Sequence, residues 1–150
     1  MKKCLLTLLV VTLTGCATVA ESPKENVVNA AMLLGTWQCK YAVGDVFFDT
    51  STTYAEDGAL KSNAKISGNR NGEALVFSAS ALGTWSLKNN VIYDDINDLQ
   101  VFGLNPASKR LEQTFKSALA SLKVAQSTIL KITMDQITVK RNDVMVCDRV

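Results

Sequence analysis

Polar and hydrophobic residues alternate along most of the chain beyond residue 34, as expected for strands with one buried face. In residues 36–43, for example, Trp37 and Cys39 alternate with polar side chains. Turn-forming pairs such as Asn71-Gly72 separate these segments and favour hairpins, because both positions of such a turn need a positive φ. The alternation predicts strands over residues 36–43, 46–54, 60–67, 73–80, 82–88, 91–93, 128–134, 136–141 and 144–149.

Three segments depart from this alternation. Residues 26–34 are apolar and rich in alanine, which favours a helical turn or short helix before the first strand. After residue 104 the apolar residues recur at helical spacing, with Asn105 as a favourable N-cap and Pro106 at the first helical position. The pattern therefore predicts one helix over residues 105–123, while residues 94–103 fit either a strand or a loop.

The beginning of the chain follows a different pattern. Lys2 and Lys3 precede a short apolar run over residues 5–13, which ends in Leu13-Thr14-Gly15-Cys16. This layout indicates a secretory signal peptide, and the run is shorter than the ~20 residues that a membrane-spanning helix needs. The ending closely resembles the lipobox of bacterial lipoproteins. That resemblance implies cleavage before Cys16 and acylation of this residue, so that several chains such as palmitate hold the protein on a membrane.

The lipoprotein resemblance also predicts organisation and location. Residues 1–15 are the expected signal peptide, residues 16–25 a lipid-anchored tether, and residues 26–150 one β domain. In that family an Asp after the acylated Cys favours retention in the inner membrane, whereas this chain has Ala17 there. We therefore expect an anchor in the outer membrane, with the domain facing the periplasm.

The cysteines support an exported domain. Under this interpretation Cys4 leaves with the signal peptide and Cys16 carries lipid, so the domain keeps Cys39 and Cys147. An even pair in an exported chain favours a disulfide, and two unpaired buried thiols are the alternative. A bridge requires the first and last predicted strands to be close together.

Two similar triplets, Gly35-Thr36-Trp37 and Gly83-Thr84-Trp85, narrow the fold. The first resembles the Gly-x-Trp start of lipocalins. Together with Asp57-Gly58 between them, the triplets are similar to bacterial lipocalin-like domains. The evenly spaced short strands favour an up-and-down barrel or a sandwich. The resemblance implies an all-β fold, an antiparallel up-and-down barrel or half-open barrel, here with one α-helix inserted before the last strands.

The same resemblance implies roles for individual residues. Lipocalins pack an arginine of a late strand across the conserved Trp ring by cation–π attraction, and here Arg141 and Arg149 are the two candidates. The residues expected to close the barrel are Gly35, Trp37, Gly83 and Trp85. The residues expected to contact a ligand are Phe47, Tyr54, Phe77 and Tyr93.

The amino-acid composition narrows the range of functions. The chain has 16 Lys and Arg against 14 Asp and Glu, and removal of Lys2 and Lys3 balances them, so nothing favours nucleic-acid binding. Histidine is absent, which removes the usual hydrolase triad and the commonest metal ligand. The densest acidic group, Asp94, Asp95 and Asp98, fits a solvated turn better than a metal site. We expect no metal, no cofactor and no enzymatic activity.

These observations predict a lipid-anchored envelope protein that binds a small hydrophobic molecule inside its barrel. An eight-stranded barrel is near the size at which side chains fill the interior or one small ligand fits. The alternative is an envelope interaction module with a solid core, an inhibitor or assembly factor that meets a protein partner through a sheet edge or the predicted helix. The basic residues of that helix are Lys109, Arg110, Lys116 and Lys123.

Overall fold

The computed structural model describes residues 27–121 and 124–150. The expected signal peptide over residues 1–15, Cys16, the tether over residues 16–25 and Lys123 lie outside the described residues. The described part of the chain forms a short 3₁₀ helix, eight strands and one α-helix. In chain order these are η1 (Ala30–Met32), β1 (Gly35–Val43), β2 (Val46–Tyr54), β3 (Ala59–Arg70), β4 (Glu73–Lys88), β5 (Val91–Gly103), α1 (Pro106–Ala120), β6 (Val124–Ile132), β7 (Gln136–Lys140) and β8 (Val144–Arg149).

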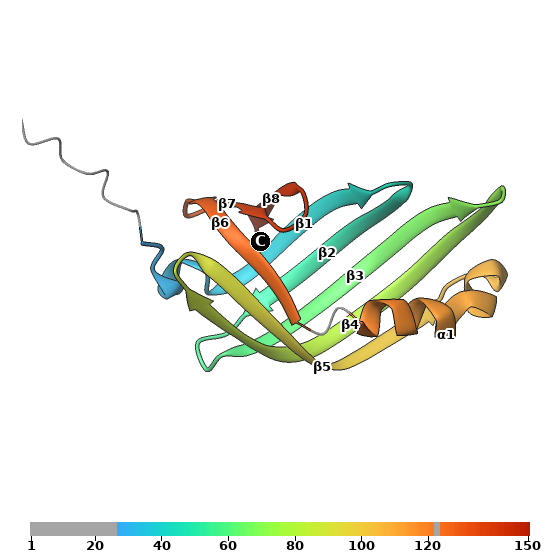
Figure 1. Cartoon of the computed structure of the whole chain (residues 1–150), viewed down its shortest axis with the longest axis horizontal. Helices are drawn as coiled ribbons and strands as arrows, with labels where there is room; N and C mark the ends of the chain where they lie inside the picture. Colours follow the sequence, from blue (N-terminus) through green and yellow to red (C-terminus); the bar gives the residue numbers. More distant parts are fainter. Residues whose placement is uncertain (1–26, 122–123) are drawn as a thin grey trace, which may run out of the picture.

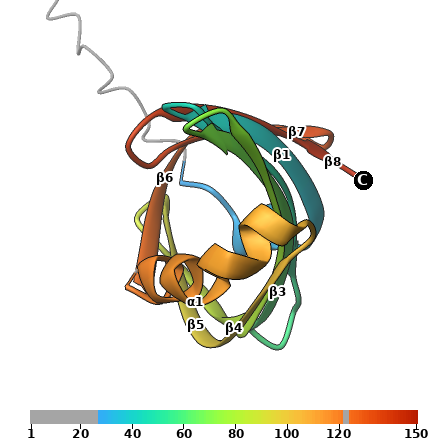
Figure 2. The same cartoon turned by 90° about the vertical axis from the view of Figure 1, so that its right-hand side faces the viewer.

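The strands form a closed antiparallel barrel in which each strand pairs with the next one along the chain (Figure 1). Strand β8 then pairs with β1, and we call this pairing the seam of the barrel. The predicted all-β fold with one inserted helix is confirmed, and of its two predicted forms the chain adopts the closed up-and-down barrel. Figure 2 looks into the barrel from one end and shows that α1 lies at this end.

A disulfide crosses the seam. It joins Cys39 of β1 to Cys147 of β8, with an S–S distance of 2.01 Å. The two residues lie opposite each other in the ladder although they are 108 positions apart in the sequence. The predicted bridge is therefore confirmed, and the alternative of two unpaired thiols is excluded.

Strands β4 and β5 differ from the sequence prediction. The alternation predicts two strands over residues 73–80 and 82–88, but both belong to the single strand β4. Residues 94–103, which fit a strand or a loop, continue β5 to its end. Between the two strands the register shifts, because Leu82 pairs with Asp98 whereas Gly83 pairs with Ile96, which leaves out Asn97.

This β-bulge explains why the pattern of β5 is hard to read. Before the bulge Ile92, Asp94 and Ile96 line the barrel interior, and after it Leu99 and Val101 do so. One extra residue moves every later side chain to the opposite face. The segment therefore follows no single alternation, although it is a strand throughout.

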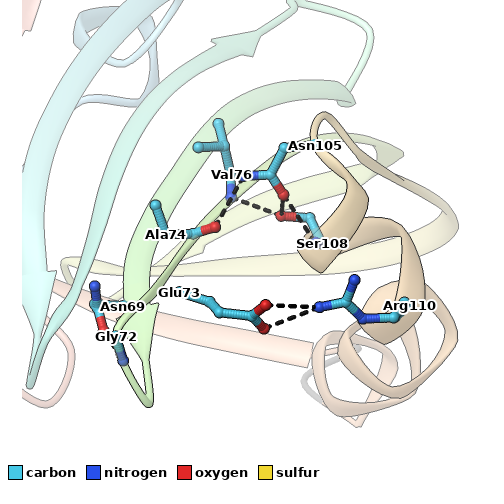
Figure 3. Close-up of polar contacts among 8 residues, drawn as sticks. All are labelled: Asn69, Gly72, Glu73, Ala74, Val76, Asn105, Ser108 and Arg110. Atoms are coloured by element: carbon cyan, nitrogen blue, oxygen red, sulfur yellow. Dashed lines mark hydrogen bonds and ion pairs between the residues drawn. The ribbon is translucent and has the colours of Figure 1, made fainter.

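Local turn and cap signals act as predicted. Asn71 and Gly72 adopt φ values of 54° and 83°, so this pair forms the expected hairpin turn between β3 and β4. Asn105 caps α1, since its Oδ1 accepts a hydrogen bond from the Ser108 N–H at 2.8 Å. Figure 3 shows Gly72 of this turn and the capping residue Asn105 beside the start of β4.

Hydrogen bonds join the beginning of helix α1 to β4 (Figure 3). The Ser108 hydroxyl is fully buried and accepts a hydrogen bond from the Val76 N–H at 2.7 Å. The Asn105 side-chain amide donates to the Ala74 carbonyl at 2.8 Å. These contacts satisfy backbone groups of β4 along an edge that no neighbouring strand covers, and they fix where the helix starts.

Apolar and ionic contacts hold the rest of α1. The Phe115 ring stacks on Phe77 of β4, with ring centroids 4.4 Å apart. Arg110 forms an exposed ion pair with Glu73 at 2.9 Å, so this part of the basic helix face is already matched by an acidic side chain. The other residues packed in the cluster beneath the helix include Ile66, Val101, Leu111 and Leu119.

Candidate ligand cavity

Trp37 closes the end of the barrel opposite α1. Its ring is 1% exposed, and its indole N–H donates a hydrogen bond to the Leu33 carbonyl at 2.7 Å. The guanidinium of Arg149 lies 4.2 Å from the ring centroid, which identifies Arg149, of the two candidates, as the cation–π partner. Gly35 has a φ of +112°, and a Cβ there would lie 2.9 Å from Arg149 Nη1. A larger residue at position 35 would therefore crowd the guanidinium.

The second triplet contributes to the same end in a different way. Trp85 packs against the apolar cluster that contains Trp37, and its indole N–H donates to the Ala55 carbonyl at 2.9 Å. The Tyr54 ring meets Trp85 edge-on at 5.3 Å between centroids. Gly83 lies at the bulge, where it allows the close approach of β5 rather than contacting the closed end.

Between Trp37 and α1 the barrel contains a cavity of about 570 Å³. Its walls come from the inward-facing residues of the strands, and α1 adds Lys116, Leu119 and Ala120. This volume lies within the usual range of ~300–1,000 Å³ for small-molecule sites. The interior is therefore not filled by the protein's own side chains. Small residues such as Ala64, Ala79 and Ala81 leave room along β3 and β4.

A charged pair lies in this mostly apolar lining. Asp94 of β5 is 7% exposed, and its Oδ2 lies 3.4 Å from Nη2 of Arg141. The Arg141 Nε also donates to the Ser127 hydroxyl at 3.2 Å. The second carboxylate oxygen of Asp94, Oδ1, is buried and has no hydrogen-bond partner among the described residues. Such an unmatched buried oxygen is uncommon in folded proteins.

The surroundings change the acidity of two groups in the cavity. Burial raises the pKa of Asp94 from 3.8 to about 6, while the positive charge of Arg141 and the nearby Tyr54 hydroxyl act in the opposite direction. Burial, and to a lesser extent the negative charge of Asp94, raises the pKa of the Tyr54 hydroxyl far above its ordinary value. Tyr54 is therefore a neutral hydroxyl at any physiological pH.

Asp94 corrects the interpretation of the acidic group as a solvated turn. Asp95 and Asp98 are exposed, as expected for that interpretation, but Asp94 points into the barrel. The reason is that β5 continues through this region, so neighbouring residues alternate between the two faces of the sheet. In the described part of the chain, no group of three or more cysteine or carboxylate side chains is placed to hold a metal ion.

The four residues predicted to contact a ligand do not lie together. Tyr54 lines the cavity, but Phe47 is on the outer surface and 60% exposed. Tyr93 lies between two inward-facing residues of β5 and so points to the other face. Phe77 is buried but is covered by Phe115 of α1, outside the cavity.

The structure adds lining residues that sequence reasoning missed. Phe48, next to Phe47, faces inward and stacks on Tyr41 with centroids 5.0 Å apart. Side chains an even number of residues apart on a strand lie on the same face. Phe48 is six residues before Tyr54 and shares its face, whereas Phe47 does not. Asp94 and Arg141 are 47 positions apart, so no local pattern connects them.

Comparisons with known proteins add a structural resemblance. No protein-family model matches the chain, and no curated protein sequence matches it. Among solved structures, the chain is similar to a lipocalin-like protein from Bacteroides uniformis, with 15% sequence identity and a TM-score of 0.40. That match covers 79% of this chain and 97% of the other. No α-helix within residues 27–121 and 124–150 is both long and apolar enough to span a membrane. By its own strand order and its closing β1–β8 pair, the chain is an eight-stranded antiparallel up-and-down barrel.

Proposed function

We propose that the protein binds a small hydrophobic molecule inside its barrel and has no enzymatic activity. The observation that carries this proposal is the cavity of about 570 Å³ between Trp37 and α1, which is lined mainly by apolar side chains. An apolar molecule that enters such a cavity gains roughly 25 cal/mol for each Å² of apolar surface removed from water. Polar side chains are interspersed in this lining, and in binding sites such groups orient a ligand.

Uptake of a neutral fluorescent probe tests this proposal. All eight strands and α1 lie between Gly35 and Arg149, so the chain from residue 17 to residue 150 contains the complete barrel. We expect N-phenyl-1-naphthylamine to bind this chain with increased fluorescence. In Ala79→Trp the new ring occupies part of the cavity, and we expect at least tenfold weaker binding.

The matched control is Ala118→Trp, which adds the same ring on the exposed face of α1. This variant should bind the probe like the unchanged chain, and circular dichroism should show that both variants are folded. A folded chain that takes up no probe would contradict ligand binding. That result would favour the interaction module, for which the exposed Phe47 and Phe102 offer apolar contacts on the outer surface.

We further propose that the barrel is attached to the outer membrane and faces the periplasm. The support is the Leu13-Thr14-Gly15-Cys16 sequence, with its resemblance to a lipobox, followed by Ala17. In bacteria that express the full chain, an alkyne fatty acid should label the protein, and Cys16→Ser should abolish labelling and leave uncleaved precursor. Labelling that persists in Cys16→Ser would place the anchor on another residue, and Cys4→Ser is the control that should leave labelling unchanged.

A further inference from the structure

The Oδ1 atom of Asp94 is a hydrogen-bond acceptor that a ligand in the cavity can use. Asp94 is more than nine-tenths buried and lines the cavity, and its Oδ1 has no hydrogen-bond partner among the described residues. A buried acceptor without a donor costs free energy, and a donor that reaches it recovers that cost. The other oxygen, Oδ2, is already used by Arg141.

The neighbouring polar groups leave Oδ1 as the free acceptor at this place. Arg141 directs its Nη2 to Asp94 and its Nε to Ser127. The Tyr54 hydroxyl is near enough to lower the pKa of Asp94, but it makes no hydrogen bond to Oδ1. An incoming molecule therefore meets an arginine whose charge is already partly neutralised and a carboxylate that lacks one donor. A hydroxyl group, which can donate a hydrogen bond, satisfies this requirement.

The charges around the cavity select against an ionised ligand. The charged residues in the described lining are Asp94, Arg141 and Lys116, so positive groups exceed negative ones. An ammonium group would enter a cavity with an excess of positive charge, and a carboxylate head at this position would meet the negative charge of Asp94. Burial without a compensating partner would add to the cost of either ion.

We propose that the barrel binds a neutral long-chain alcohol or similar amphiphile, whose hydroxyl donates a hydrogen bond to Oδ1 of Asp94. The hydrocarbon part lies along the apolar walls that include Ile92 and Ile96 of the same strand. This inference rests on the proposed function, because it names the class of ligand for the same cavity.

Displacement of N-phenyl-1-naphthylamine by matched compounds tests the inference. The compounds are 1-decanol, its isomer 1-methoxynonane, decanoic acid and decylamine, each added to the chain from residue 17 to residue 150. The alcohol and the ether have the same atoms, but only the alcohol donates a hydrogen bond. Because a hydrogen bond to a charged group is among the stronger ones, we expect 1-decanol to displace the probe at about tenfold lower concentration than 1-methoxynonane.

Two variants assign this preference to Asp94. Asp94→Leu combined with Arg141→Met removes the acceptor and its partner together, so that no uncompensated charge is left in the interior. We expect this double variant to bind the alcohol and the ether equally. Thr50→Val is the control, because it removes a different hydroxyl from the cavity wall and should keep the preference.

The possible results separate the inference from the proposed function. If the unchanged chain takes up the probe but does not prefer 1-decanol to 1-methoxynonane, or binds the acid or the amine more tightly, the inference is overturned while ligand binding stands. A preference that persists in the double variant overturns the role of Asp94. If the folded chain takes up no probe, the proposed function itself fails. If the double variant does not fold, the ranking of the four compounds on the unchanged chain decides whether the inference stands.

Discussion

The carboxylate of Asp94 lies in surroundings that oppose its charge. It is buried against apolar neighbours, and its partner Arg141 offsets only part of the cost, which is why the pKa is raised to about 6. A raised carboxylate pKa means that the folded state binds the proton more tightly than the unfolded chain does. The protein therefore gives up some stability at neutral pH to keep this charged group inside the barrel.

We expect the contribution of Asp94 to the free energy of unfolding to fall as pH rises from about 4 to about 6. The ordinary pKa of 3.8 applies to the unfolded chain and the value of about 6 to the folded protein. Below this range both states are protonated and the contribution is absent, and above it the full cost is present. The difference corresponds to roughly 3 kcal/mol.

Urea unfolding between pH 4 and pH 7 measures this effect. Asn does not titrate, so the stability of Asp94→Asn relative to the unchanged chain should increase by roughly that amount across the range. Asp95→Asn is the control, because Asp95 is the exposed neighbour on the same strand. Parallel pH profiles for the unchanged chain and Asp94→Asn would show that Asp94 is not held in the way described.

At the scale of elements, the bulge between β4 and β5 decides which residues reach the cavity. It moves the inward face of β5 from Asp94 and Ile96 to Leu99. The strands come so close at this point that a Cβ on Gly83 would lie 2.0 Å from the Asp95 carbonyl oxygen. Glycine at position 83 is therefore required by the approach of a neighbouring backbone.

Gly83→Ala should accordingly destabilise the barrel. The added methyl group can be accommodated only by moving the backbone of β5, and overpacking of this kind typically costs about 1–3 kcal/mol. Ser86→Ala, at an exposed position of the same strand, should change stability little. Thermal unfolding of the two variants makes the comparison. Equal melting temperatures would mean that β5 shifts freely at the bulge.

Elements whose determinants are local were predictable from the sequence, and the cavity was not. The Asn105 cap and the Asn71-Gly72 turn depend on a few consecutive residues, so the sequence indicates them directly. In β2, however, the inward face carries Thr50 and Thr52 as well as aromatic residues. Hydrophobicity alone therefore gives no reason to place Phe47 outside and its neighbour inside.

At the scale of the whole molecule, one covalent bond supports the closure of the ring. The pairing of β1 with β8 is short and includes the bridged pair Cys39 and Cys147. The sequence predicted this bridge because only two cysteines remain after the expected signal peptide and the expected lipid attachment site at Cys16 are set aside. The sequence did not decide whether Arg141 or Arg149 covers Trp37, because the choice depends on the position of β8 relative to the closed end of the barrel.

Removal of the bridge should weaken the closed barrel substantially. Cross-linking residues 108 positions apart restricts the unfolded chain strongly, and loss of a native disulfide typically costs about 2–5 kcal/mol. We expect the Cys39→Ala, Cys147→Ala double variant to unfold at lower urea concentration than the unchanged chain. Reduction of the unchanged chain should reproduce that loss, and a reduced chain as stable as the oxidised one would contradict it.

The position of the seam also sets an order of events while the chain is being made. Strand β1 is synthesised first, yet its partner across the seam is the last strand, β8. Consecutive strands can form hairpins as they appear, whereas the ring waits for residues 144–149. Cys39 can therefore join its native partner only after Cys147 has followed it, 108 residues later. If Cys39 is oxidised early with another thiol, the bridge across the seam cannot form until that bond has been exchanged.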